Sequence, residues 1–331
     1  MPAKTNRNSM MYKTLFALLL FLSGFYPQCQ KNSSSTSTGE NLPFWSKKKS
    51  NACTGVLENG ACKEYPDFYS PTPGRIAVFE DGTFAATSPS KKQVWVYHKS
   101  GRIKKIIQLI KRPLALEASP NHRLFIGNTE DQKVDIFTRD GVFVKSFSVG
   151  VLFPSDIAVA AELNLVFVTD SKAHKVLAFD LEGGFQYEFG SKGTLNGQFD
   201  FPSGIAINRG LTPSRLVVTD FNNRRVQVFS LTGTWVATME TVPGTGGMMG
   251  SSSSGRPLGA ITDSSGNIFV VDTLYAAVYV FNSSFILQRT ISEYGEAAGQ
   301  LRSPIDIAFA DTNTILITNY LNNRIEKINA Y

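Results

Sequence analysis

Residues 217–229, VVTDFNNRRVQVF, place a polar segment between two β-prone runs. The segment, residues 221–225, sets two asparagines beside two arginines, a composition that would suit a phosphate or nucleic-acid contact. Asn and Asp also form turns, because their side chains hydrogen-bond to nearby backbone groups. Similar segments recur along the chain, and this recurrence favours a turn between two strands over a site for chemistry.

Six copies of the pattern follow one another. Each copy begins with a Pro and a short apolar run, and a polar residue ends the next apolar run 15 to 18 residues later. Apolar residues two and four positions before that polar residue give the period of a half-buried strand. The copies begin at Pro73, Pro113, Pro154, Pro202, Pro257 and Pro304, and their polar positions are Ser88, Asn128, Asp170, Asp220, Asp272 and Asn319.

Each copy has room for four strands, and six four-stranded sheets arranged radially cover one another's faces. The sequence therefore predicts an all-β, six-bladed β-propeller over residues 53–331. The last copy ends without a fourth strand, so we expect an N-terminal strand within Ala61–Tyr69 to close the ring. Cys53 and Cys62 flank a predicted hairpin turn at Asn59-Gly60, and an oxidising compartment would let them form a disulfide.

Two copies resemble the NHL repeat. They are GQFDFPSGIAI (197–207) with VVTDFNNRRVQVF (217–229), and GQLRSPIDIAF (299–309) with ILITNYLNNRIEKI (315–328). The resemblance implies a six-bladed propeller of four-stranded antiparallel blades. Lyases and lactonases with histidine or acidic metal sites near the axis are built on similar propellers.

The formal charge of +6 lies outside the predicted propeller. Residues 1–28 and 29–50 each carry +3, so residues 51–331 are neutral, and we expect no nucleic-acid binding. Lys13 precedes the apolar stretch 15–25, which has the length of a signal peptide and is too short to span a bilayer. Residues 1–28 are therefore predicted to be an export signal, although an uncleaved anchor is the alternative.

Cys29 heads a Ser/Thr-rich stretch, so residues 29–52 are predicted to form a disordered polar tether. This layout resembles a bacterial lipoprotein, with Cys29 lipidated and the protein secreted, periplasmic or held at the cell envelope. The preceding residues, Phe25-Tyr26-Pro27-Gln28, depart from the usual lipoprotein box. A thiol without a role, or a eukaryotic secreted protein with glycosylation at Asn32 and Asn282, are the alternatives.

Two sets of residues are candidate binding sites. Arg75, Asp156 and Asp306 stand two positions after their repeat Pro and are expected at the mouth of the axial channel. Lys175, Arg225 and Arg324 share the last column of the turn and would form a weak basic ring. The long connections 190–201, 240–256 and 292–303 are expected on the same face as these turns, where loops on a rigid scaffold often bind ligands.

No catalytic set is evident, because His98 and His122 are expected on the face opposite His174. We therefore expect a non-catalytic, monomeric binding module for a protein, peptide or glycan, without a cofactor. The alternative is a metal-dependent lyase or hydrolase at the axial mouth. Calcium is possible there, because its oxygen ligands can come from several blades.

Overall fold

The computed structural model describes residues 56–58, 61–63, 66–240, 255–291 and 294–331. The chain divides into two compact units, Met1–Lys63 and Glu64–Tyr331. In the described part of the first unit, β1 (Val56–Glu58) pairs antiparallel with β2 (Ala61–Lys63). Glu58 lies opposite Ala61, as the hairpin predicted at this place requires.

The second unit contains six sheets in chain order. Blade 1 consists of β3 (Ile76–Val78), β4 (Phe84–Ser88), β5 (Gln93–Tyr97) and β6 (Ile103–Gln108), and blade 2 of β7 (Pro113–Ala118), β8 (Arg123–Asn128), β9 (Lys133–Thr138) and β10 (Phe143–Phe147). Blade 3 consists of β11 (Pro154–Ala160), β12 (Leu165–Asp170), β13 (Lys175–Phe179) and β14 (Phe185–Phe189), and blade 4 of β15 (Pro202–Asn208), β16 (Arg215–Asp220), β17 (Arg225–Ser230) and β18 (Trp235–Glu240).

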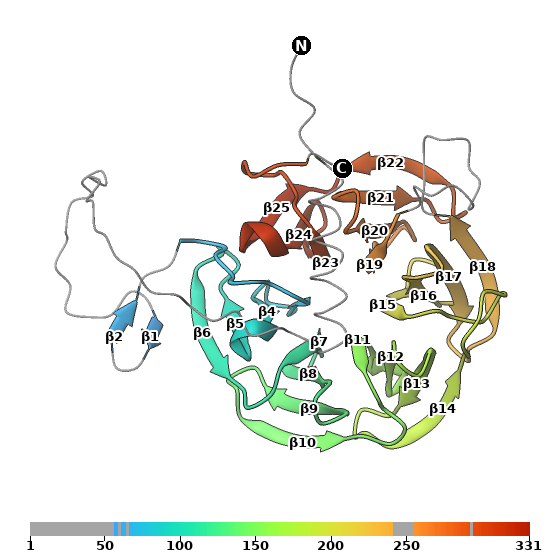
Figure 1. Cartoon of the computed structure of the whole chain (residues 1–331), viewed down its shortest axis with the longest axis horizontal. Helices are drawn as coiled ribbons and strands as arrows, with labels where there is room; N and C mark the ends of the chain where they lie inside the picture. Colours follow the sequence, from blue (N-terminus) through green and yellow to red (C-terminus); the bar gives the residue numbers. More distant parts are fainter. Residues whose placement is uncertain (1–55, 59–60, 64–65, 241–254, 292–293) are drawn as a thin grey trace, which may run out of the picture. The chain divides into compact units, whose positions relative to one another are not determined.

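Blade 5 consists of β19 (Pro257–Thr262), β20 (Ile268–Asp272), β21 (Ala277–Phe281) and β22 (Leu287–Ile291), and blade 6 of β23 (Pro304–Asp311), β24 (Thr314–Asn319) and β25 (Arg324–Asn329). The 3-10 helices in the described residues are η1 (Pro89–Lys91), η2 (Ala161–Leu163) and η3 (Tyr320–Asn322). All strand pairs within the blades are antiparallel, and the predicted six-bladed β-propeller is confirmed (Figure 1).

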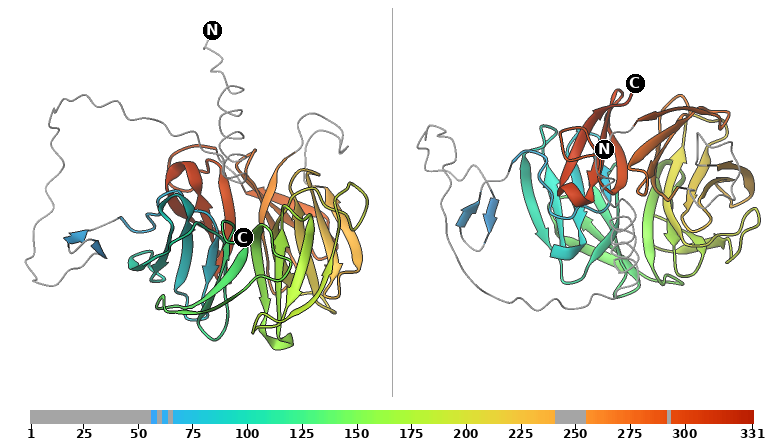
Figure 2. Two further views of the ribbon diagram at one scale, coloured as in Figure 1. Left: turned by 60° about the horizontal axis from the view of Figure 1, so that its bottom comes forward. Right: turned by 45° about the horizontal axis from the view of Figure 1, so that its top comes forward.

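The blades surround a central axis, with the first strand of each blade innermost and β6, β10, β14, β18 and β22 at the rim (Figure 1). Figure 2 shows the strands running between the two faces of the ring. We call one of them the connection face. It carries the turns between second and third strands and the connections between blades. The other, the hairpin face, carries the turns between first and second and between third and fourth strands.

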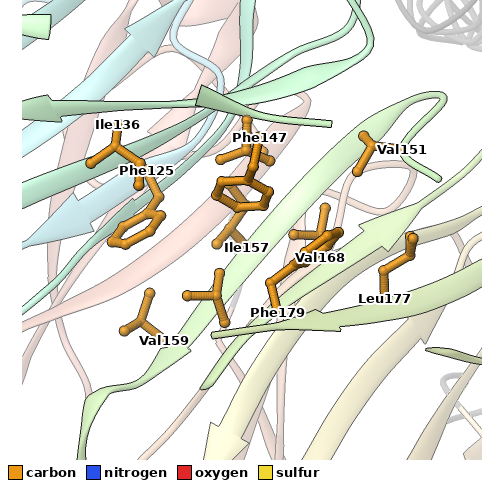
Figure 3. Packing of buried hydrophobic residues seen from close by; sticks show 12 residues of the cluster. Phe125, Ile136, Phe147, Val151, Ile157, Val159, Val168, Leu177 and Phe179 are labelled. Atoms are coloured by element: carbon orange, nitrogen blue, oxygen red, sulfur yellow. The ribbon is translucent and has the colours of Figure 1, made fainter. Parts of the chain in front are cut away.

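Apolar side chains fill the spaces between neighbouring blades. Between blades 2 and 3, Phe125 and Ile136 face Ile157 and Val168 (Figure 3). Phe147, near the end of the rim strand β10, packs on Phe179 with 4.7 Å between ring centroids. Burying each large apolar side chain stabilises the fold by about 1.5–3 kcal/mol. The alternating residues of the sequence pattern, such as Val168, thus fill one side of each sheet. The other side is buried as well, as Phe125 shows, so the second strands are buried on both faces instead of half-buried.

The innermost strands carry a bulge just after their Pro, where the register against the second strand shifts. A Thr in the second strand bridges this irregular place. Thr219 Oγ1 accepts a hydrogen bond from Gly204 N and donates one of 2.7 Å to Leu258 O of the next blade. The Thr219 hydroxyl thus satisfies backbone groups at the bulge and joins two adjacent blades.

The predicted closure of the ring is correct in part. Tyr69 forms a single antiparallel bridge with Arg324, and Phe68 O accepts a hydrogen bond of 2.9 Å from Ile325 N. The N-terminal segment therefore covers β25, but as one bridge instead of a strand. Within the first unit, Ala61–Lys63 pairs with β1.

Several predictions concern residues outside the described part. They are the export signal at 1–28, the tether at 29–52 with Cys29, and most of the connection 240–256. Cys53 is also outside it, and the side chain of Cys62 is not described, so the disulfide stays a prediction.

Candidate functional site

Arg225 begins β17 on the connection face of blade 4 and is only 5% exposed. Its Nε donates a hydrogen bond of 2.9 Å to Asp220 Oδ2. Its Nη1 and Nη2 donate to the carbonyls of Thr194, Leu195 and Gln198, each at 2.8 Å. The guanidinium therefore clamps the connection between β14 and β15, a structural task that leaves it little contact with solvent.

The Asp220 carboxylate also accepts hydrogen bonds from other residues in and around the turn. Its carboxylate accepts hydrogen bonds from Asn223 Nδ2 at 2.8 Å, Gln227 Nε2 at 3.3 Å and Asp200 N at 2.7 Å. Burial raises the pKa of Asp220, and the hydrogen bonds from Asn223 and Arg225 oppose that rise. The polar segment that suggested a binding patch is thus a turn, as its recurrence predicted.

The left-handed residue of this turn is Arg224, although the sequence pointed to the asparagines. Asn223 has another task, since its Nδ2 also donates to Gly193 O at 2.8 Å. The same position is left-handed in every blade, with φ between 51° and 59°, whatever the residue. The residues are Lys92, Gln132, His174, Arg224, Ala276 and Asn323.

Blade 6 repeats the clamp. Arg324 pairs with Glu326 and donates from Nη2 to the carbonyls of Glu296, at 2.9 Å, and Ala297. Gly299 N donates to Glu326 Oε2 at 3.0 Å, as Gly197 N donates to Gln227 Oε1 at 2.9 Å in blade 4. Each of these connections therefore lies on its own blade as a fixed loop.

Lys175 is also engaged within its blade, where its Nζ lies 2.6 Å from Glu188 Oε2. Lys175, Arg225 and Arg324 each have a carboxylate partner, so their charges are balanced locally. The structure brings them to one face, as predicted, but in separate ion pairs.

Arg75, Asp156 and Asp306 meet inside the axial channel. Arg75 Nη1 lies 3.2 Å from Asp306 Oδ1 and 3.5 Å from Asp156 Oδ2, and all three residues are buried. Asp306 Oδ2 accepts from Ile76 N at 3.0 Å, and Asp156 Oδ2 accepts from Ile205 N at 2.9 Å. Each carboxylate thus joins its own blade to the next, and the triad crosses the channel near its connection-face end.

Beyond this triad, a cavity of about 280 Å³ follows the inner strands to Arg209 and Phe309 at the hairpin face. Most of the residues that line it are aliphatic, but Glu117, Asp156, Asp306 and Arg209 also line it. Within the described part of the chain, no hydrogen bond or ion pair to Glu117 is found. The sequence reasoning missed Glu117, which occupies the column that holds Ala77, Ala158, Ala206 and Ala308 in other copies.

Burial dominates the electrostatics of this channel. It raises the pKa of Asp156 to about 7, with the Arg75 guanidinium acting in the opposite direction. It also raises the pKa of Asp306, and it raises that of Glu117 well above its usual range, where the Asp156 and Asp306 charges add to the effect. Burial in the channel therefore favours the protonated form of these carboxyls.

The histidines lie as predicted. His122 is in a hairpin-face turn and His98 in another, whereas His174 is on the connection face, where its Nδ1 accepts from Phe201 N at 3.1 Å. Among the described residues, no three His, Cys, Asp or Glu side chains are grouped to hold a metal ion. The described residues also include no helix with the length and apolar character needed to cross a membrane.

Exposed apolar side chains favour the connection face. Seven of the sixteen large ones among the described residues lie there, against four on the hairpin face and five on rim strands. Leu195 is 70% exposed and Tyr294 is 60% exposed, and both stand on the clamped loops. The seven are Ile110, Val149, Leu152, Leu195, Tyr275, Tyr294 and Leu321.

No family model matches the chain. Over 132 residues, 40% of its length, it is 27% identical to Protein brain tumor of Drosophila melanogaster, and it spans only 12% of that protein.

Solved structures of similar fold include a catalytically inactive virginiamycin B lyase from Staphylococcus aureus with quinupristin, at TM-score 0.58 and 14% identity, covering 81% of this chain and 84% of that one. A gluconolactonase from Xanthomonas campestris matches at TM-score 0.60 and 15% identity, over 80% and 88%. A protein of unknown function from Bacteroides thetaiotaomicron matches at TM-score 0.62 and 15% identity, over 80% and 71%. At these identities the matches show the fold alone, a six-bladed β-propeller.

Proposed function

We propose that this chain is a non-catalytic module that binds a partner protein through its connection face. The observation that carries the proposal is Leu195, which is 70% exposed on a loop whose backbone is held by the buried Arg225. Binding an apolar anchor on a loop that is already fixed costs little conformational entropy. Burying the exposed Leu195 side chain against a partner removes apolar surface from water, which favours association.

A matched loop supports the same face. Tyr294 is 60% exposed on the loop that Arg324 clamps in blade 6. A protein partner fits these apolar groups better than a glycan, whose hydroxyls need polar contacts. We also infer that the repeats are of NHL type, because their Gly-Gln and Asn-x-Arg parts, far apart in sequence, are hydrogen-bonded to each other: Arg225 donates to Gln198 O in blade 4, and Asn322 donates to Gln300 O in blade 6.

The test is site-specific photocrosslinking in cells that naturally make the protein. A photoreactive amino acid at Leu195 is expected to capture one defined protein, identified by mass spectrometry. The matched control is the same amino acid at Ile286, which is 60% exposed on the hairpin face. The Leu195 adduct should disappear in a Tyr294→Ser background. Equal labelling from both faces, or an adduct made of glycan, would overturn the proposal.

A further inference from the structure

The second and third strands of blades 2 and 6 carry the same kinds of polar group at corresponding positions. In blade 6, Asn319 Nδ2 donates to Glu326 Oε1 at 3.1 Å, and Arg324 pairs with Glu326. In blade 2, Asn128 Nδ2 donates to Asp135 Oδ2 at 3.3 Å, and Lys133 Nζ lies 2.9 Å from Asp135 Oδ1. Blade 2 thus retains an amide, a cation and a carboxylate like those that hold a loop in blade 6.

The loops that lead into these blades differ in length. Twelve residues, 292–303, connect β22 to β23, and twelve, 190–201, connect β14 to β15. Only four residues, 109–112, connect β6 to β7. This connection is too short to fold back over Lys133 and Asp135 as the longer loops do over their own blades.

A cavity of about 310 Å³ lies where the loop would be. Lys133, Asp135 and Asn128 line it, together with Phe137, Phe143 and Ile110. Asp135 Oδ1 is buried and has Lys133 Nζ as a cation partner at 2.9 Å, but within the described part of the chain it accepts no hydrogen bond from a backbone N–H. In blade 6 the corresponding carboxylate accepts one from Gly299 N. Ile110 is 85% exposed and Phe143 is 53% exposed. A partner bound in the cavity would bury these two apolar side chains.

We propose that this pocket between blades 1 and 2 binds a glycine-containing turn of a partner protein, as blades 4 and 6 bind their own loops. The turn donates a backbone N–H to Asp135, and its preceding carbonyls accept hydrogen bonds from Lys133 Nζ. A glycine is required, because Gly197 and Gly299 adopt φ of 80° and 81°, which other residues rarely reach. The proposal rests on the protein-binding function and names a second contact for it.

Blade 3 explains why we single out blade 2. Its connection is also short, but Leu177 replaces the polar residue at the position of Asp135, and the buried Val151 packs in the same cluster. That place is therefore apolar and covered. Lys175, the counterpart of Lys133, has Glu188 as its partner.

The test measures binding of a cyclised peptide, YGEAAGQLRS, which is the sequence of residues 294–303, to the whole chain by titration calorimetry. We expect binding to wild type that weakens at least tenfold in Asp135→Asn and in Lys133→Met, because each removes a hydrogen bond to a charged group. Lys175→Met is the matched control and should bind like wild type. A peptide carrying valine in place of the glycine of Gly299 should bind at least tenfold more weakly. As a control, a cooperative thermal unfolding transition will be measured for each variant to verify that the variant is folded.

The proposal for this pocket would be overturned if the peptide did not bind to folded wild type, or if it bound equally well to Asp135→Asn. Concentration-dependent dimers that Asp135→Asn abolishes would identify a second copy as the occupant and would also overturn it. If the peptide does not bind but crosslinking at Leu195 is retained, the pocket is rejected and the protein-binding function stays in place. Loss of crosslinking with peptide binding retained would reject that function and leave the pocket as a peptide site.

Discussion

Replacing Arg225 with alanine tests whether the motif arginine holds the fold or serves a ligand. In the folded protein its side chain is 6% exposed and its partner Asp220 is fully buried. The substitution leaves the Asp220 carboxylate without a cation and removes three hydrogen bonds from the carbonyls of the loop. Breaking a buried ion pair from one side costs about 3–5 kcal/mol, so we expect a loss of stability in that range.

The matched variant is Arg324→Ala, because Arg324 makes the same kind of clamp in blade 6 with a side chain that is 31% exposed. Solvent screens this pair, so we expect a smaller loss, about 1–2 kcal/mol. Arg225→Lys should fall between the two, since lysine keeps the charge but cannot reach three carbonyls in fixed directions. Thermal unfolding gives the order of the three variants.

Limited proteolysis then locates the defect. The loop 190–201 contains the exposed Lys192, and trypsin should cut there in Arg225→Ala under conditions that leave wild type intact. Protection of Lys192 in the variant, or a larger loss of stability in Arg324→Ala, would refute the clamp.

The effect of Arg225→Ala also depends on pH. Burial already raises the folded-state pKa of Asp220 above its unfolded value, and losing Arg225 should raise it further. A carboxyl with a raised folded pKa favours the folded state when it is protonated, and this contribution is lost as the pH rises through the folded pKa. The destabilisation should therefore be larger at pH 8 than at pH 5. A loss that is independent of pH would contradict this account of the buried charge.

Three further outcomes are expected. The raised pKa of Asp156, about 7, and that of Glu117 predict that unfolding free energy increases as pH falls from 8 to 5, and Glu117→Gln should flatten this dependence in urea unfolding. Gly204→Ala should lower the melting temperature by several degrees, because its Cβ would stand 2.0 Å from Leu258 O across the blade interface. Cys29→Ala should release the protein from membranes in cell fractionation, and unchanged fractionation would argue against lipidation.

The sequence predicted the scaffold well, because the alternation of strand residues and the formation of turns both depend on side-chain type. The polar positions end the second strands, and the third strands begin where the last column of the turn predicted. It also placed Arg75, Asp156 and Asp306 on the axis. Their pairing could not be derived, since it depends on how six separated strands face one another.

Two features escaped the sequence for different reasons. The partners of Arg225 are main-chain carbonyls, and carbonyls have no signature in a sequence. In the described part of the segment predicted to close the ring, Tyr69 forms one bridge, and residues 61–63 pair with β1. Glu117, in contrast, had a visible signal. It is the charged residue in a column that otherwise holds alanine or isoleucine, as at Ile261.

The motif residues themselves indicate where recognition takes place. Blades 4 and 6 each have a cation at the start of the third strand and a polar residue two positions later. The chain's own loop makes hydrogen bonds with both residues, so in these blades both residues already have their hydrogen-bond partners within the chain. Blade 2 keeps Lys133 and Asp135 without a loop of comparable length. Asp135 has Lys133 as its cation partner, and because a carboxylate oxygen can accept more than one hydrogen bond, Asp135 can also accept one from a backbone N–H that enters the cavity. Variation in loop length on a constant set of polar residues can thus turn a structural contact into a binding site without a change in the fold.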